Sequence, residues 1–450
     1  GQINLLLGRV VEIHLPDADR RLIDTSHGRV PDLDGIGTIQ LLGSIAMDSL
    51  RISAGVDSYP RLGDRVYAAP HSFIANLPKF MEAAEAEASH VLLKLGSIDV
   101  APESYVSVKP EKLFGRHCAI LGATGGGKSW TTARIIEECL RYKTKIILLD
   151  ATGEYRGFDG EHVANFHLGA PVNTAKSSAP CTLPQTSFIE SDFIALFEPA
   201  GKVQGPKLRA AIRSLRLAAL APHVATGGII KKIDQSKVPI MTEEAKAGIA
   251  EKLDDPQQAF DVWKLVSQIE QECVYPDGFG SARGQKDFTK WGGDSGEVSF
   301  CLSLMSRING ILSSSSFECV FKSKAPALTE KISSFVSNED RLLRICLSGV
   351  AFEFKAREIV ANVIGRHLLN MARNGAFKSR PVVVIVDEAH NFLGRQIGAD
   401  DAVARLDAFE LIAKEGRKYG LNICLSTQRP RDITEGVLSQ MGTLVVHRLT

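Results

Sequence analysis

The stretch that decides the fold runs Cys118-Ala-Ile-Leu-Gly-Ala-Thr-Gly-Gly-Gly-Lys-Ser129. It fits the pattern G-x-x-x-x-G-K-[ST], whose fixed positions are Gly122, Gly127, Lys128 and Ser129. A short apolar run precedes the loop as a buried strand would, and an apolar stripe at helical spacing follows it over 131–142. A glycine-rich turn could fit the pattern by accident, but the flanking strand and helix signals favour a loop that cradles phosphate.

The loop predicts how a nucleoside triphosphate and Mg²⁺ would be held. Its glycines let successive N–H groups point at the β-phosphate, and the new helix adds its positive end. Lys128 is expected to reach the β- and γ-phosphates, and the Ser129 hydroxyl is expected to hold Mg²⁺. The residues predicted to bind the nucleotide here are Gly122, Ala123, Thr124, Gly125, Gly126, Gly127, Lys128, Ser129 and Trp130.

A second strand signal, the five β-branched residues Val382 to Val386, ends in Asp387-Glu388. Ligands of a parallel sheet bind at the carboxyl ends of its strands. Asp387 is therefore expected to bind Mg²⁺, and Glu388 to orient the attacking water or take its proton. Such a run is often only a strand entering a solvated turn, but a phosphate loop in the same chain favours the catalytic interpretation. The pair predicts hydrolysis rather than transfer.

Two further residues have open alternatives. Gln428 follows another strand signal and is expected beside the γ-phosphate, where it would hold the water, unless it only caps the next turn. Arg417, just before that strand, is either a surface charge or an arginine finger that reaches a neighbouring subunit's site.

Composition limits the class of protein. The 450 residues suffice for two or three domains, and 44% hydrophobic with 23% charged residues is ordinary for a globular protein. The net charge of +1 means that any contact with nucleic acid would be local. With no run of 18 apolar residues and eight scattered cysteines, we expect a cytoplasmic protein with reduced thiols and no membrane span. The ends, Gly1 and Thr450, suggest a processed or partial chain.

The organisation along the chain predicts an α/β fold. Residues 1–110 contain short β-type runs and predict a small barrel or sandwich for assembly or partner docking. Those runs are 8–15, 38–42, 50–53, 64–68 and 91–95. Strand and helix signals then alternate over 111–190 and again over 341–450, as in a parallel sheet. The residues between them, 191–340, read as a helical insertion.

Five segments in this order and spacing resemble the HerA family of hexameric DNA-translocating ATPases, which are relatives of the FtsK motors. They are Arg116–Ser129, Asp150–Tyr155, Val384–Asn391, Glu415–Leu421 and Ser426–Pro430. The resemblance implies a RecA-like sheet, a homo-hexamer with ATP and Mg²⁺ between subunits, and double-stranded DNA through a central pore. It also implies a nuclease or other effector docked on the N-terminal β-barrel, of the HAS type, in DNA repair or anti-phage defence.

The resemblance assigns three more residues. Arg417 matches the finger supplied in trans, Arg116 matches an arginine near the nucleotide, and Glu154 matches a recurrent acid near the site whose role stays open. The family usually continues with a C-terminal segment across the ATPase domain, and the chain's stop at Thr450 puts ring closure in doubt.

The DNA-contacting surface has a weaker signal. Arg209, Arg213 and Arg216 share a helical face, with Lys202 and Lys207 upstream, and could line a pore, although such a face is often merely solvated or paired. Two other functions stay open: an ATP-gated scaffold that docks and activates a partner enzyme, and a solitary P-loop ATPase without nucleic acid.

Overall fold

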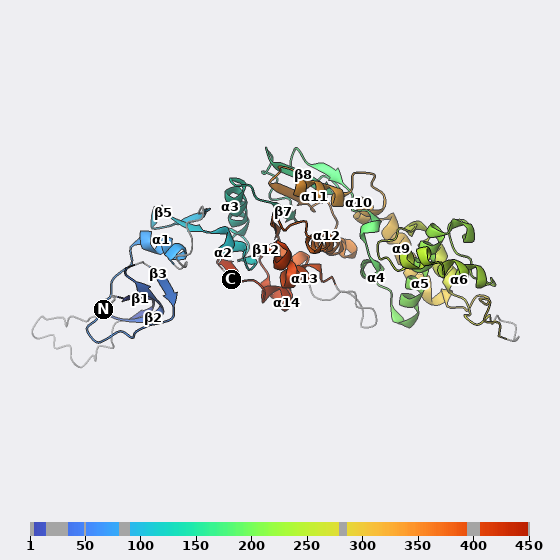
Figure 1. The fold of residues 1–450 in the computed structure, drawn as a ribbon, viewed down its shortest axis with the longest axis horizontal. Coiled ribbons are helices and arrows are strands. Elements are labelled where there is room, and N and C mark those ends of the chain that lie inside the picture. The colour runs from blue at the N-terminus through green and yellow to red at the C-terminus, as the bar shows by residue number, and fades with distance from the viewer. Residues whose placement is uncertain are drawn as a thin grey trace, which may run out of the picture. The chain divides into compact units, whose positions relative to one another are not determined.

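An eight-stranded, wholly parallel sheet lies at the centre of residues 111–450 (Figure 1). Its strands lie in the order β13-β6-β12-β11-β7-β10-β8-β9. Their bounds are β6 Cys118–Leu121, β7 Ile146–Asp150, β8 Val163–Leu168, β9 Ala179–Cys181, β10 Leu342–Cys346, β11 Val382–Val386, β12 Leu421–Thr427 and β13 Thr443–Val446. The central strands are apolar and buried on both faces, as parallel sheets require. The predicted α/β fold is confirmed.

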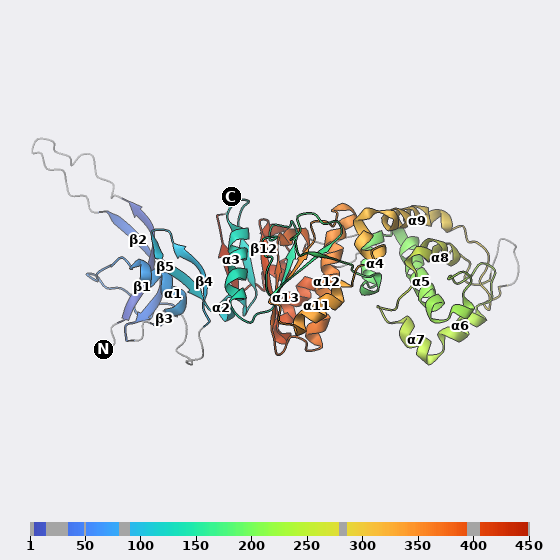
Figure 2. The same cartoon turned by 90° about the horizontal axis from the view of Figure 1, so that it is seen from above.

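The computed structural model describes residues 4–14, 35–48, 51–80, 91–278, 286–393 and 406–448. Residues 1–110 and 111–450 form two compact units. From residue 110 on, the helices of the sheet unit are α2 Pro110–Phe114, α3 Lys128–Leu140, α4 Glu190–Phe197, α11 Leu328–Ser337, α12 Ala356–Arg373, α13 Ala408–Glu415 and α14 Glu435–Leu438. α3 covers one face of the sheet and α12 and α13 cover the other, as right-handed crossovers dictate (Figures 1 and 2).

The predicted insertion is helical. Its members beyond α4 are α5 Gly201–Leu220, α6 Val238–Glu244, α7 Ala247–Leu253, α8 Leu265–Glu272, α9 Val298–Ser313 and α10 Glu318–Phe321. Of these, α5 to α9 gather at one end of the sheet unit, beyond α4 and α12 (Figure 2). Leu217 of α5, Ile240 of α6 and Leu253 of α7 belong to a small hydrophobic core of their own.

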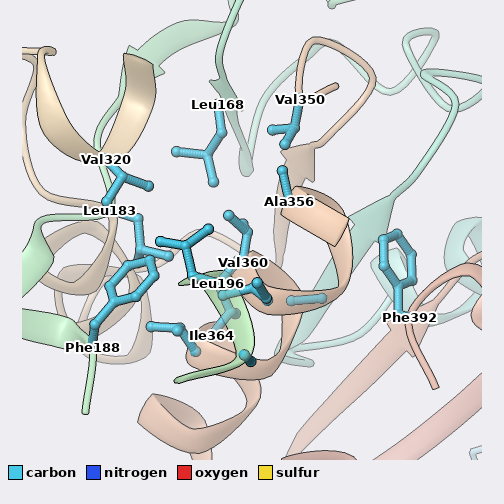
Figure 3. Close-up of a cluster of buried hydrophobic side chains, with 14 of the residues drawn as sticks. Leu168, Leu183, Phe188, Leu196, Val320, Val350, Ala356, Val360, Ile364 and Phe392 are labelled. Atoms are coloured by element: carbon cyan, nitrogen blue, oxygen red, sulfur yellow. The ribbon is translucent and has the colours of Figure 1, made fainter. Parts of the chain in front are cut away.

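One continuous hydrophobic core joins the sheet to this insertion. Figure 3 shows Leu183, Phe188 and Leu196 converging on Val360 and Ile364, which lie on α12. Leu183, Phe188 and the two α12 residues are at most 1% exposed, so each contributes roughly 1.5–3 kcal/mol of burial free energy. The insertion is therefore fixed to the sheet by α4 and α12 rather than tethered by a loop.

A fully buried ion pair crosses two neighbouring strands at the sheet's centre. Arg344 of β10 donates from Nε to Asp150 Oδ2 of β7 over 2.7 Å, and both side chains are 0% exposed. The same carboxylate accepts the backbone N–H groups of Gly153, at 2.7 Å, and Tyr155, at 3.2 Å. The pair therefore fixes the loop that carries Glu154.

We expect Arg344→Met to lower the free energy of unfolding by about 3–5 kcal/mol, because it leaves the Asp150 charge buried without its partner. The measurement is a urea titration. Arg380→Met is the matched control, since Arg380 pairs with Glu339 across 3.8 Å on an exposed surface and should lose less than about 1 kcal/mol. Equal losses in the two variants would contradict this account of the buried pair.

The N-terminal unit is built from short antiparallel strands. β1 Asn4–His14, β2 Ile36–Ala46 and β3 Arg51–Ala54 form one sheet, and β4 Leu93–Ile98 pairs with β5 Ala101–Val108 in another. Helix α1, His71–Phe80, belongs to the same unit. The prediction of a strand at 64–68 is wrong, because these residues pair with no strand in the described part of the unit. Closure of the two sheets into a barrel stays a prediction.

Candidate nucleotide-binding site

The phosphate loop lies between the end of β6 and the start of α3. Gly125 and Gly127 have φ angles of 73° and 95°, a left-handed conformation that side chains disfavour. Gly127 is the residue directly before the first turn of α3. The backbone N–H groups of the curled loop therefore lie next to those at the positive N-terminal end of the helix. The left-handed backbone conformation that a phosphate-binding loop needs therefore explains why Gly125 and Gly127 are glycines.

The loop's own side chains match this cradle. Lys128 is 6% exposed, and its Nζ donates to the carbonyl oxygen of Ala123 across 3.2 Å, so the ammonium group folds back over the loop. Ser129 is half-buried in the first turn of α3. Trp130 is 83% exposed, and its indole is therefore accessible to a ligand or a second protein.

Asp387 and Glu388 follow β11 at the carboxyl edge of the sheet. Asp387 is 1% exposed, and its Oδ2 has no hydrogen-bond partner among the described residues. Burial first, then the charges of Glu388 and Asp150, raise the pKa of Asp387 to about 7. Burial also raises the pKa of Glu388, although the Lys128 ammonium opposes this. A buried carboxylate oxygen without a donor is well suited to a cation.

Gln428 closes the other side of the loop. The Thr124 hydroxyl donates a hydrogen bond to Gln428 Oε1, which brings the residue after β12 onto the phosphate loop. His390 lies between the two strand ends: its Nδ1 is 3.3 Å from Glu388 Oε2 and 3.3 Å from Thr427 Oγ1. Glu388 Oε2 nevertheless lacks an aligned hydrogen bond, so the carboxylate stays available to a water molecule.

Glu154 lies on the loop after β7 and faces the same acids. Its side chain is exposed, and its charge raises the pKa values of Asp387 and Glu388. The structure therefore brings together Lys128, Glu154, Asp387, Glu388 and Gln428 around the loop. Sequence reasoning did not single out His390, although it lies in the quoted segment Val384–Asn391.

Arg116 and Arg417 lie at the opposite, amino edge of the sheet. Arg116 precedes β6, whereas Arg417 lies in a 3₁₀ turn, Gly416–Tyr419, directly before β12. Both are exposed. At 3.3 Å per residue, the seven residues of β12 put about 23 Å between Arg417 and Gln428, and the four residues of β6 put about 13 Å between Arg116 and the loop. Neither arginine can therefore reach its own chain's phosphate loop, which excludes Arg116 as a ligand in cis.

The three α5 arginines do not form one solvent-facing row. Arg216 is 6% exposed and donates to the carbonyl oxygens of Pro256, at 2.8 Å, and Leu253, at 3.4 Å. Arg209 pairs with Glu190 across 2.8 Å, and Arg213 pairs with Asp254 across 2.9 Å. A pore-lining role is wrong for Arg216, because α5 packs this face against the segment after α7. Its replacement by Glu would test folding rather than DNA contact.

The site suits Mg²⁺. Among the described residues no three His, Cys, Asp or Glu side chains gather into a metal site of their own. Mg²⁺ at a phosphate loop needs only one or two protein oxygens, with phosphates and water supplying the others. The Ser129 hydroxyl and the unpartnered Asp387 Oδ2 would supply those oxygens, and the ion would neutralise charge on the phosphates.

Comparisons with known proteins agree with this geometry. The family model described as the central domain of helicase HerA matches residues 93–264. A probable helicase of Methanocaldococcus jannaschii is 21% identical over 419 residues, which cover 92% of this chain and 70% of the relative. The chain is thus similar to HerA helicases, in agreement with the resemblance that its motifs indicate.

A second HerA relative is the DNA double-strand break repair helicase of Saccharolobus solfataricus. It is 23% identical over 338 residues, 75% of this chain and 55% of the relative. The chain thus spans between about half and 70% of these two relatives. Among solved structures, the bacterial conjugative coupling protein TrwB aligns over 82% of this chain and 74% of its own, at 14% identity and a TM-score of 0.43.

The geometry of the phosphate loop and the similarity to HerA helicases together identify the chain as a P-loop ATPase. All eight cysteines lie in the described part of the chain and are buried and free. No helix among the described residues is long and apolar enough to cross a membrane.

Proposed function

We propose that the chain is the ATPase subunit of a hexameric motor that translocates on, or unwinds, double-stranded DNA. The observation that carries this proposal is the position of Arg116 and Arg417 at the sheet edge opposite the phosphate loop. Positive side chains placed there are out of reach of their own chain's nucleotide, but they are free to contact the nucleotide of a neighbouring copy. A ring of identical subunits supplies such a neighbour to every site.

Each site residue has a defined part in this proposal. Lys128 and the loop N–H groups hold the phosphates of ATP, while Ser129 and Asp387 hold Mg²⁺. Glu388 accepts the proton of the attacking water, or orients it, and Gln428 fixes that water beside the γ-phosphate. Arg417 of the neighbouring subunit neutralises the charge that develops as the phosphoryl group leaves.

The names of the relatives support the proposed substrate. Several are named DNA double-strand break repair helicases, which supports duplex DNA as the track and its passage through the ring's pore. We extend the proposal to a nuclease or other effector enzyme docked on the N-terminal unit, acting in DNA end processing or anti-phage defence in the cytoplasm.

A second candidate is an ATP-gated hexameric scaffold that docks and activates an effector without sustained translocation. The first two strands of the N-terminal unit favour it, because they expose large apolar side chains. Val10 is 52% exposed, Ile13 is 75% exposed and Ile36 is 49% exposed. Such a surface is typical of a protein–protein contact.

The decisive experiment measures mass in solution together with ATP turnover, with and without linear duplex DNA. A motor is expected to be a hexamer whose turnover rises severalfold with DNA, and Lys128→Ala is the control that should abolish turnover in both conditions. A hexamer indifferent to DNA would favour the scaffold. A monomer with DNA-independent turnover would contradict both candidates.

A further inference from the structure

A buried histidine lies between the two arginines at the amino edge of the sheet. His117 follows Arg116, has a left-handed φ of 60° and is only 3% exposed. Burial and the positive charge of Arg417 lower the pKa of its imidazole, against the opposing effect of its hydrogen bond to Ala413. The two positive side chains thus have a neutral ring between them at neutral pH.

Both ring nitrogens of His117 are used. The backbone N–H of Ile423 donates to Nδ1 across 3.0 Å, so Nδ1 is an acceptor. The other nitrogen, Nε2, therefore carries the proton and donates to the carbonyl oxygen of Ala413, also across 3.0 Å. The ring cannot make both bonds in its other tautomer or when it is protonated.

The two residues that these hydrogen bonds reach lie on either side of Arg417 in the chain. Ala413 lies near the end of α13, Ile423 lies near the start of β12, and Arg417 is in the turn between them. One side chain from the segment before β6 therefore anchors both ends of the turn.

Arg116 is held in position by contacts with Gly442. Its carbonyl oxygen accepts the N–H of Gly442 across 2.8 Å, and its side-chain stem crosses that glycine. A Cβ atom on Gly442 would lie 2.4 Å from Arg116 Cβ, so no larger residue fits without moving the arginine. The His117 ring thus anchors the turn of Arg417, while Gly442 fixes Arg116, the residue next to His117 in the chain.

We propose that His117 is a positioning residue that holds Arg116 and Arg417 in register, so that the two guanidinium groups meet a neighbouring subunit's nucleotide as one unit. This inference rests on the proposed function, in which Arg417 acts in trans. The ring touches no nucleotide itself, and its contribution passes through the arginines.

A double-mutant cycle tests the inference on the full chain. His117→Asn offers an acceptor near the Nδ1 position, whereas His117→Gln offers a donor near the Nε2 position, so each variant keeps one of the two bonds. Each is expected to lower kcat for ATP about tenfold, the effect of one lost hydrogen bond, with little change in KM. In an Arg417→Ala background the same substitutions should lower kcat no further.

A merely structural histidine would behave differently. His167 is the matched control, since it is 7% exposed on β8 and bonded to Ser178, far from the arginines in sequence. Any effect of His167→Asn should be the same with and without Arg417. Independent, multiplicative losses for His117→Asn and Arg417→Ala would overturn the inference, as would wild-type turnover in both His117 variants.

The double-mutant cycle also distinguishes a failure of the positioning role of His117 from a failure of the proposed action of Arg417 in trans. If Arg417→Ala alone leaves turnover unchanged, the trans arginine and the role of His117 both fail. If Arg417→Ala slows turnover and the His117 effects multiply with it, only the positioning role fails. Should one His117 variant not fold, as judged by its melting curve, the other completes the cycle.

Discussion

Glu388→Gln is expected to slow ATP turnover by about 10²- to 10⁴-fold, the usual contribution of a positioned general base. The amide keeps the size of the carboxylate but cannot take a proton from water. Nucleotide affinity should stay within a few-fold of wild type, because in the proposed mechanism the loop and Lys128, rather than Glu388, hold the phosphates. The measurements are kcat from phosphate release and the Kd of ATP on the variant.

The control for this prediction is Glu339→Gln, which removes a carboxylate that is 73% exposed at the surface and should leave both quantities unchanged. If the Glu388→Gln protein hydrolyses ATP at more than a tenth of the wild-type rate, Glu388 is not the general base and another residue must have that role. Glu154 is then the next candidate, since its charge reaches both Asp387 and Glu388.

The parts of the site that sequence alone predicted are local in the chain. The phosphate loop needs only the glycines and Lys128 within a dozen residues, and the backbone conformation they impose is independent of the rest of the fold. Asp387 and Glu388 are recognisable because a β-branched run stops at them. The parallel α/β sheet followed from the same alternation of strand and helix signals.

The remaining features depend on partners that are distant in the sequence. Arg344 stands alone in an apolar strand, which indicates that a partner exists, but Asp150 lies 194 residues away. Arg216 shares a helical face with two solvated arginines, and only the packing of Pro256 and Leu253 shows that it is buried. No sequence pattern indicates the role of His117, because the hydrogen bonds of its ring are to backbone atoms.

Arg417→Ala is expected to lower ATP turnover by about 10³-fold or more, the range that arginine fingers contribute. Lys418→Ala is the matched control, because it removes a neighbouring exposed cation that the proposed mechanism does not use. It should stay close to wild type. Loss of activity in both variants to the same extent would point to general surface charge rather than a finger.

Mixing subunits shows whether Arg417 acts on a neighbour. A Lys128→Ala subunit cannot hydrolyse ATP but still presents its arginine, whereas an Arg417→Ala subunit keeps its own loop and lacks only the arginine that it would lend. Rings that contain both therefore pair an intact loop with an intact finger at some interfaces, and turnover should return to a measurable fraction of wild type. A mixture of Lys128→Ala with Glu388→Gln should stay inactive, because both defects lie on the same side of every interface. If the mixture of Lys128→Ala with Arg417→Ala also stays inactive, action in trans is contradicted and Arg417 is best described as a surface charge.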